Sequence, residues 1–234
     1  MHPKLNAMLA QLPEADYQML VPSLKLVSLH AGQTLYEPGQ AIQSAYFPTN
    51  CLVVIARQLR DGASIDTCLI GSEGIMGLRG LLLTPSYLPQ AHIYVSVSGL
   101  AYKMDIQQLR EATKASSAIH DMCLRARESN LMNMSIEVAC CHFHSNEQRL
   151  AKWLLTRMDR YGPPVFKTTH QAIANSLGVR RESVTHALAK LRCLSFARGQ
   201  IEVVDRSALE SACCECYAQQ KGPPAESAAM ALRV

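Results

Sequence analysis

Basic side chains gather around a glycine turn in residues 168–191, and their chemistry suits nucleic acid. Arg180 and Arg181 stand two and three positions after Gly178. The planar guanidinium of arginine carries paired donors that match the edge of guanine in the major groove of DNA. These residue types favour contact with base pairs, provided that the flanking residues form elements that can enter the groove.

Two short helices are predicted on either side of this turn. Thr168 or Thr169 can cap the first helix, and Gly178 tolerates the positive φ that a tight turn requires. Val179 would close the small core between the helices. The apolar residues on one face of the first helix are Ile173, Ala174 and Leu177. This pattern predicts a helix-turn-helix with both arginines at the start of the second helix.

The second helix is predicted to bury one face and expose the other. Val184, Leu188 and Leu191 follow the i, i+4, i+7 spacing of a buried helix face. The residues on the opposite face are Glu182, Thr185, His186 and Ala189. The predicted DNA-binding residues are Thr169, His170, Arg180, Arg181, Glu182, Ser183, Thr185, His186, Lys190 and Arg198.

An ordinary helical hairpin could show the same turn and apolar stripes, and the charge distribution favours DNA binding over that interpretation. Residues 1–115 hold 8 lysines and arginines against 8 aspartates and glutamates, whereas residues 146–206 hold 11 against 5. The whole chain has a formal net charge of +4. The excess positive charge therefore lies around the predicted helix-turn-helix, where it would attract a phosphate backbone.

The composition of the 234-residue chain, with 48% hydrophobic and 18% charged residues, is that of a soluble globular protein. No apolar run approaches the roughly 18 residues of a membrane span, and the first residues lack the apolar segment of a signal peptide. We therefore expect a cytoplasmic protein without membrane contact. The 9 cysteines are irregularly spaced, which in a reducing cytosol indicates free thiols.

The predicted elements change character along the chain. Residues 13–26 indicate a short amphipathic helix, and turn signals then recur through residues 27–104 between short apolar runs, as in a jelly roll or sandwich. Helical character returns after Asp105, which can cap a helix. Residues 196–204 indicate a hairpin that would form the wing of a winged helix.

A long helix is predicted over residues 116–145, because apolar residues repeat there at three- to four-residue spacing. The members of this seam are Ile119, Met122, Ala126, Leu131, Met134, Val138 and Cys141. A helix packed on its own domain would show the same pattern. A homodimer helix is the favoured interpretation, since a motif that reads a palindrome needs a two-fold partner.

The order of these parts resembles the Crp/Fnr superfamily of bacterial transcription regulators over about residues 20–217. The most specific segment is Gly-Val-Arg-Arg-Glu-Ser-Val-Thr at residues 178–185, and residues 147–155 are similar to the helix that leads into the family's DNA-binding domain. The resemblance implies an α+β fold in four parts. They are a cyclic-nucleotide-binding-like jelly-roll sensor domain at 1–115, a dimerisation helix at 116–145, a winged helix-turn-helix domain at 146–217 and a flexible tail at 218–234.

The resemblance also implies roles for individual residues. In the family, an Arg-Glu pair at the start of the recognition helix contacts base edges, which transfers to Arg181 and Glu182. A further arginine is usual four positions later, where this chain has His186, so the family's half-site preference does not transfer. The implied partners are double-stranded DNA, a second copy of the chain and RNA polymerase.

The predicted ligand pocket departs from family members that bind cyclic AMP. Those members use a glutamate for the ribose and an arginine for the cyclic phosphate, whereas this chain has Ile75 and the segment Pro89-Gln90-Ala91. A phosphate without its cation loses its strongest contact, although Arg79 could compensate. The candidate pocket residues are Gly74, Ile75, Met76, Gly77, Leu78, Arg79, Gln90 and Ala91. We expect independence of cyclic AMP, with a cyclic-nucleotide response as the alternative.

Two clusters of cysteine and histidine could bind a metal. Residues 140–144 read Cys-Cys-His-Phe-His, and residues 213–216, on the expected last helix, read Cys-Cys-Glu-Cys. On helices, Cys140 would share a face with His144, and Cys213 with Cys216. Neither cluster has the separated pairs typical of a zinc site, so packed thiols without metal or cofactor are favoured.

A redox response is a further alternative, and Cys193 is its candidate, while an inert packed thiol is the favoured interpretation of this residue. This cysteine stands near Lys190 and Arg198, and neighbouring cations favour a thiolate. An iron-sulfur cluster of the family's kind is not expected, because those members use an N-terminal cysteine group and the first cysteine here is Cys51.

Two other classes of function fit the sequence less well. A metal-dependent enzyme of the cupin type also uses a jelly roll, but its site needs several converging ligands and the strand region offers only His30 and His92. A partner-binding scaffold that has lost DNA binding conflicts with the intact basic hairpin. The favoured interpretation is a homodimeric, sequence-specific DNA-binding transcription regulator, not an enzyme.

Overall fold

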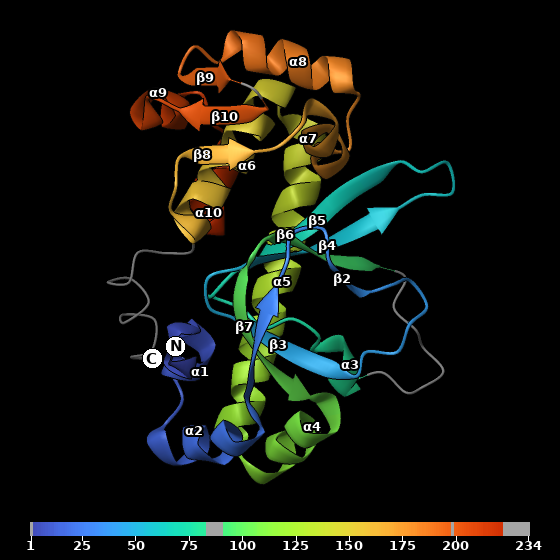
Figure 1. Cartoon of the computed structure of the whole chain (residues 1–234), viewed down its shortest axis with the longest axis vertical. Coiled ribbons are helices and arrows are strands. Elements are labelled where there is room, and N and C mark those ends of the chain that lie inside the picture. Colours follow the sequence, from blue (N-terminus) through green and yellow to red (C-terminus); the bar gives the residue numbers. More distant parts are fainter. Residues whose placement is uncertain (1, 83–90, 198, 222–234) are drawn as a thin grey trace. The chain divides into compact units, whose positions relative to one another are not determined.

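The chain folds into two compact units, Met1–Met132 and Asn133–Val234, in a computed structural model that describes residues 2–82, 91–197 and 199–221 (Figure 1). One long helix, α5 (Ser117–Phe143), contributes residues to both units. Within these described ranges, no helix is both long and apolar enough to cross a lipid bilayer.

The strands described in the first unit form two antiparallel sheets, in the orders β1-β7-β3 and β2-β6-β4-β5. They are β1 (Lys25–Leu29), β2 (Thr34–Tyr36), β3 (Ser44–Pro48), β4 (Leu52–Gln58), β5 (Ser64–Ile70), β6 (His92–Val97) and β7 (Gly99–Asp105). The hydroxyl of Tyr36 in β2 donates to the carbonyl of Ser44 in β3 at 2.7 Å and so joins the two sheets. The strand-rich first domain predicted from the turn signals is confirmed.

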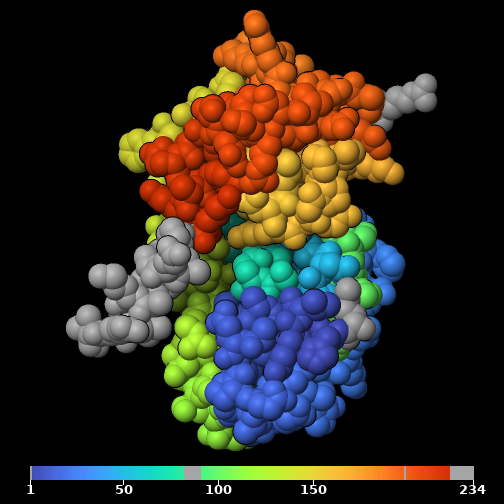
Figure 2. Space-filling view, turned by 90° about the vertical axis from the view of Figure 1, so that its left-hand side faces the viewer, coloured from blue at the N-terminus to red at the C-terminus, as the bar shows by residue number. Residues whose placement is uncertain are grey.

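Short helices cover one side of the sheet β1-β7-β3. They are η1 (Pro3–Leu5), α1 (Ala7–Ala10), α2 (Glu14–Leu20), η2 (Val21–Ser23), α3 (Arg79–Leu82) and α4 (Ile106–Ala115). Leu9 and Leu20 pack with Phe47 and Leu109 in one buried cluster, and the N-terminal helices (blue) cover a face of the unit in Figure 2. The helix expected over residues 13–26 is shorter, because Pro22 lacks the amide hydrogen that would continue it.

The seam predicted on α5 divides into two different environments. Ile119, Met122 and Ala126 are fully buried in the core of the first unit, so this part of the seam packs on its own domain. Leu131 and Val138 are exposed instead. The assignment of the whole seam to a dimer contact is therefore wrong for its first three members.

The second unit combines helices with a small antiparallel sheet in the order β8-β10-β9. Its elements after α5 are α6 (Asn146–Tyr161), β8 (Val165–Lys167), α7 (His170–Leu177), α8 (Arg181–Lys190), β9 (Leu194–Ala197), β10 (Gln200–Val203), α9 (Arg206–Ser211) and α10 (Cys216–Gln220). Ser145 and Gln148 form a capping box that begins α6. Leu150 and Leu154 of α6 pack with Ile173, Leu188 and Leu209 in a single core.

The last two helices are held on α6 by a polar network around Asp159. The carboxylate of Asp159 accepts from Arg206 of α9 at 2.6 Å and from the hydroxyl of Tyr217 of α10 at 2.7 Å. Lys221 lies 3.1 Å from the same carboxylate. The helix α10 continues through Gln220, beyond the residue at which the tail was expected to begin.

Candidate nucleic-acid interface

The helix-turn-helix predicted from the glycine turn is present as α7 and α8. Thr169 caps α7, since its hydroxyl accepts from the backbone amide of Ala172 at 3.1 Å. Gly178 takes the left-handed conformation with φ 64°, and its amide donates to Ala174. Val179 packs against the core of the unit. These contacts confirm the predicted cap, turn and closing residue.

The helix α8 has the two faces predicted from its spacing. Val184, Ala187 and Leu188 are buried against α6 and α7. The exposed residues of the helix are Arg181, Glu182, Thr185, His186, Ala189 and Lys190, with Ser183 half-buried. Arg180 lies exposed at the N-cap position, where its side chain makes no capping hydrogen bond. The predicted base-reading residues on α8 thus share an accessible face.

A buried arginine of α6 fixes the end of α7. The guanidinium of Arg149 donates to the carbonyl of Leu177, the last residue of α7, and to the sulfur of Cys141 at 3.2 Å. A carbonyl at a helix C-terminus has no hydrogen-bond partner within the helix. A cation there supplies that hydrogen bond and interacts favourably with the negative end of the helix dipole. Sequence reasoning did not find this role of Arg149.

Two of the predicted DNA-binding residues contact each other. Nδ1 of His170, at the start of α7, lies 2.9 Å from the hydroxyl oxygen of Thr185 in α8. The Thr185 hydroxyl also donates to the carbonyl of Arg181 at 3.2 Å. This pair holds the start of α7 against α8, so His170 and Thr185 have a positioning role in addition to their predicted contact with DNA.

Lys190 at the end of α8 makes an ion pair with Glu147 of α6, at 2.7 Å between Nζ and Oε1. The hydrogen bond from Lys190 is the main cause that lowers the pKa of the Glu147 carboxyl to about 2. This pair links the first turn of α6 to the last turn of α8.

The cations of residues 146–206 do not all face solvent. Arg149, Lys152 and Arg157 are buried, and their charges serve contacts within the unit. Exposed cations in the same range are Lys167, Arg180, Arg181, Lys190, Arg192 and Arg206, of which Lys190 and Arg206 form ion pairs within the unit, while Arg198 lies outside the described residues. A pocket of about 540 Å³ beside them is lined by His170, Arg181, Phe196 and Gln200 among others, between α7 and the hairpin of β9 and β10.

Cys193, the candidate for redox sensing, lies in the core of this unit rather than on the exposed face of α8. The side chain is buried, and burial raises the pKa of its thiol. Removal from water opposes the charged form, so the thiolate that a redox role requires is disfavoured at Cys193.

The candidate ligand-pocket residues of the first unit contribute largely to its core. Ile75, Met76 and Leu78 are buried, and the amide of Met76 donates to Tyr46 of β3 at 2.9 Å. Gly77 has φ +93° and packs against the backbone of Ser44 so closely that a side chain would not fit. Arg79 is half-buried at the start of α3, Gly74 and Ala91 are buried, and Gln90 lies outside the described residues.

A comparison with known proteins places the interface in a family. Residues 148–212, which include α7, α8, β9 and β10, match the Crp-like helix-turn-helix domain. The global nitrogen regulator of a Nostoc species is 24% identical over 167 residues, which cover 68% of this chain and 75% of that protein.

Solved structures share the fold of most of the chain. A protein assigned to the Crp/Fnr family of transcriptional regulators, from Eubacterium rectale, has a TM-score of 0.72 at 16% identity and covers 89% of this chain and 98% of its own. FixK2 from Bradyrhizobium japonicum has a TM-score of 0.67 at 16% identity, with 82% and 98% covered. Residues 148–212 therefore match a Crp-like helix-turn-helix domain, and the chain shares the fold of solved structures of Crp/Fnr transcription regulators.

Proposed function

We propose that the chain acts as a homodimer on a two-fold symmetric DNA site in the cytoplasm, with α8 in the major groove. The exposed face of α8, which Arg181 begins, is the observation that carries this proposal. In helix-turn-helix proteins the N-terminal residues of the second helix contact base edges, and paired donors on arginine suit guanine. RNA polymerase is the proposed protein partner.

An apolar strip on α5 supports the dimer. Leu124, Leu131 and Val138 are 47%, 52% and 71% exposed, and they are spaced by seven residues. Apolar residues that repeat every seven positions meet a partner helix along a continuous seam. This strip excludes the buried residues Ile119 and Met122, so it replaces the longer seam predicted from the sequence.

The proposal includes DNA binding that does not depend on cyclic AMP. The position where relatives that bind the nucleotide carry a glutamate is Ile75, which is fully buried in the core of the first unit. A buried isoleucine offers a ribose no hydrogen bond. Arg79 is the described cation nearest to this turn in sequence, and it leaves a cyclic-nucleotide response as the second candidate.

The proposal is tested by selecting binding sites for the full chain from a random DNA library without any nucleotide. We expect enrichment of a palindrome whose half-sites lie about 34 Å apart, because two copies of α8 enter successive major grooves on one side of the duplex. Enrichment of a single, asymmetric half-site would contradict the homodimer, and no enrichment at all would contradict sequence-specific binding by the free protein.

A further inference from the structure

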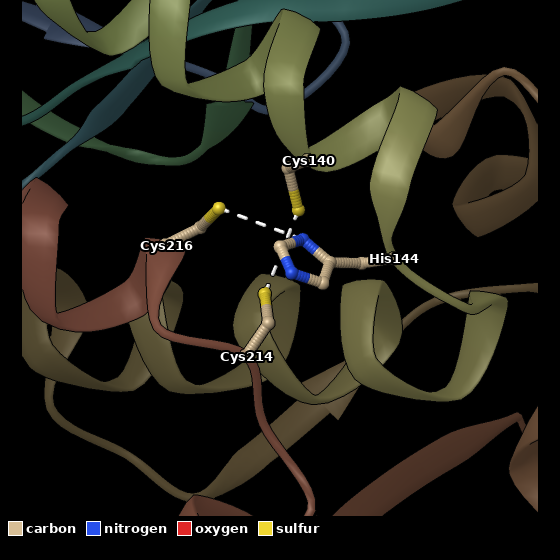
Figure 3. Close-up of side chains that lie close together, drawn as sticks. All are labelled: Cys140, His144, Cys214 and Cys216. Atoms are coloured by element: carbon tan, nitrogen blue, oxygen red, sulfur yellow. Dashed lines mark hydrogen bonds between the residues drawn. The ribbon is translucent and has the colours of Figure 1, made fainter.

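Four sulfur and nitrogen ligands converge in the second unit, away from the exposed face of α8. Cys140 lies in the last turn of α5, and His144 follows that helix directly. Cys214 precedes α10, and Cys216 is its first residue. Their ligand atoms all lie within 4.8 Å of one another, and the four side chains point toward a common centre (Figure 3). One pair comes from each of the two clusters noted in the sequence.

The distances within this group match the edges of a zinc tetrahedron. Sγ of Cys140 lies 3.7 Å from Sγ of Cys214, and Sγ of Cys216 lies 3.6 Å from Nδ1 of His144. With Zn–S bonds of about 2.3 Å and Zn–N bonds of about 2.0 Å, tetrahedral angles give S···S edges of about 3.8 Å and S···N edges of about 3.5 Å. The two measured distances correspond to two opposite edges of such a tetrahedron, since they share no atom.

The imidazole of His144 is oriented as a metal ligand is. Its Nε2 lies 3.2 Å from a carboxylate oxygen of Glu215, so Nε2 can carry the proton and donate it to that oxygen. Nδ1 then presents its lone pair to the three sulfurs. Histidines that bind metals commonly hold the second ring nitrogen against a carboxylate in this way, which fixes both the tautomer and the ring orientation.

Simple packing of apolar thiols explains the group less well. Ile136 is the sole large aliphatic residue in the buried cluster that contains Cys140, Cys214 and Cys216. An imidazole nitrogen directed at three sulfurs gains little from apolar contact. A disulfide between Cys140 and Cys214 would need the sulfurs at about 2.05 Å, well below their separation of 3.7 Å.

We propose that Cys140, His144, Cys214 and Cys216 bind one zinc ion in a closed, structural Cys₃His site. Three thiolates and an imidazole are ligands that zinc prefers, and four protein ligands leave no position for a substrate or a water. Binding releases the three thiol protons to solvent. The ion fastens the end of α5 to the segment between α9 and α10. The site is independent of the proposed DNA recognition, so either can fail alone.

The metal content of the full chain, purified without chelators and under reducing conditions, tests the site. We expect about one zinc per chain by mass spectrometry of the elements, and loss of most of it in Cys140→Ser and in Cys214→Ser. Cys213→Ser is the matched control, because Cys213 adjoins Cys214 yet its sulfur faces the carbonyl of Gln148 at 4.0 Å. This variant should keep the zinc. His144→Cys should keep it as well, since a fourth thiolate replaces the imidazole.

Spectroscopy of the unaltered protein tests the same site without relying on the folding of variants. X-ray absorption at the zinc edge should count three sulfurs and one nitrogen, and cobalt substitution should give thiolate charge-transfer bands with the intense visible bands of a tetrahedral ion. Any of four results would overturn the proposal. The first two are a metal-free protein that binds neither zinc nor cobalt, and a protein that contains iron in place of zinc. The other two are a Cys140–Cys214 disulfide in freshly purified protein, and a loss of zinc in Cys213→Ser equal to that in the ligand variants.

Discussion

Arg181 begins α8 with its side chain in solvent, where it can donate to a base edge. Arg181→Ala should therefore lose about 1–3 kcal/mol of binding free energy on the selected site and flatten the base preference at one position of each half-site. Titrations of fluorescent duplexes, one carrying the site and one of random sequence, measure both effects.

Lys167→Ala is the control for this substitution. Lys167 is an exposed cation at the end of β8, outside the face of α8 that is proposed to read bases, so its loss should weaken both duplexes by similar factors and lower the salt dependence. Lys190 is less suitable, because its ion pair with Glu147 adds an effect on stability. If Arg181→Ala behaved like Lys167→Ala, the assignment of Arg181 to base recognition would be wrong.

Substitution of Cys193 should have little effect on how DNA binding responds to oxidation. Since the thiol is buried and burial raises its pKa, it should react slowly with peroxide, which attacks the thiolate. Peroxide should change DNA binding to the same extent in the natural protein and in Cys193→Ser. A peroxide-dependent loss of affinity that Cys193→Ser abolishes would restore the redox hypothesis for this residue.

The sequence predicted those site residues whose roles depend on neighbours along the chain. Thr169 and Gly178 act on residues three and four positions away, so a cap and a turn can be recognised from spacing. Arg149 bonds a carbonyl 28 positions away, and nothing in an amphipathic helix indicates which distant group an arginine will meet. The Cys₃His group escaped prediction for the same reason, because each cluster supplies only half of it and Cys213 lies outside α10.

At the scale of elements, the pair of Glu147 and Lys190 couples α6 to α8 in a manner that depends on pH. The pKa of Glu147 is lowered from 4.5 to about 2, so the pair stabilises the fold above about pH 4.5 and this contribution disappears as pH falls toward 2. Glu147→Gln should lose on the order of 0.5–1 kcal/mol of unfolding free energy at neutral pH and almost none near pH 2.

Denaturant unfolding at several pH values measures this contribution. Lys190→Gln serves as the matched partner variant, because Glu147→Gln should have a smaller effect in its background if the ion pair is the cause. A loss from Glu147→Gln that stayed constant from pH 7 to pH 2 would show that the carboxylate charge has no part in it.

The exposed strip of α5 gives a prediction about assembly. Leu131→Glu combined with Val138→Glu places two charges in the proposed seam, so the protein should become monomeric at micromolar concentration and lose most of its affinity for a palindrome. Light scattering coupled to size-exclusion chromatography reports the mass. Ser129→Glu, on the opposite side of the helix by its 3.6-residue period, is the control that should stay dimeric.

The same helix shows where prediction of elements from the sequence fails. The turn signals were sufficient to predict the strand region, and the caps and apolar spacing were sufficient to predict the long helix and the helix-turn-helix. On α5, however, Met122 faces the core and Leu124 faces solvent, so two apolar faces give overlapping periodicities that spacing alone cannot separate. The four-residue helix α3 was missed because so short an element has no period to detect.

At the scale of the whole molecule, we expect the free protein to bind its palindrome without cyclic AMP or cyclic GMP. A ligand that makes no preferential contacts with one conformation cannot shift the equilibrium toward it. Binding titrations with and without millimolar nucleotide should agree, and affinity should fall steeply with salt. Tightening of about tenfold or more with either nucleotide would instead assign Arg79, or another cation, to the cyclic phosphate.

The network around Asp159 has a consequence for synthesis of the protein. The chain emerges from the ribosome N-terminus first, so α7, α8 and the hairpin are complete before Arg206 and Tyr217 can reach Asp159. Leu209, fully buried in the core that also contains Val184 and Leu188 of α8, is also still missing at that stage. A nascent chain thus contains the side chains proposed to contact bases before the contacts that hold their helices together can form. The protein should bind DNA only after the last helices have been translated. A prematurely terminated product would expose its apolar core to proteases.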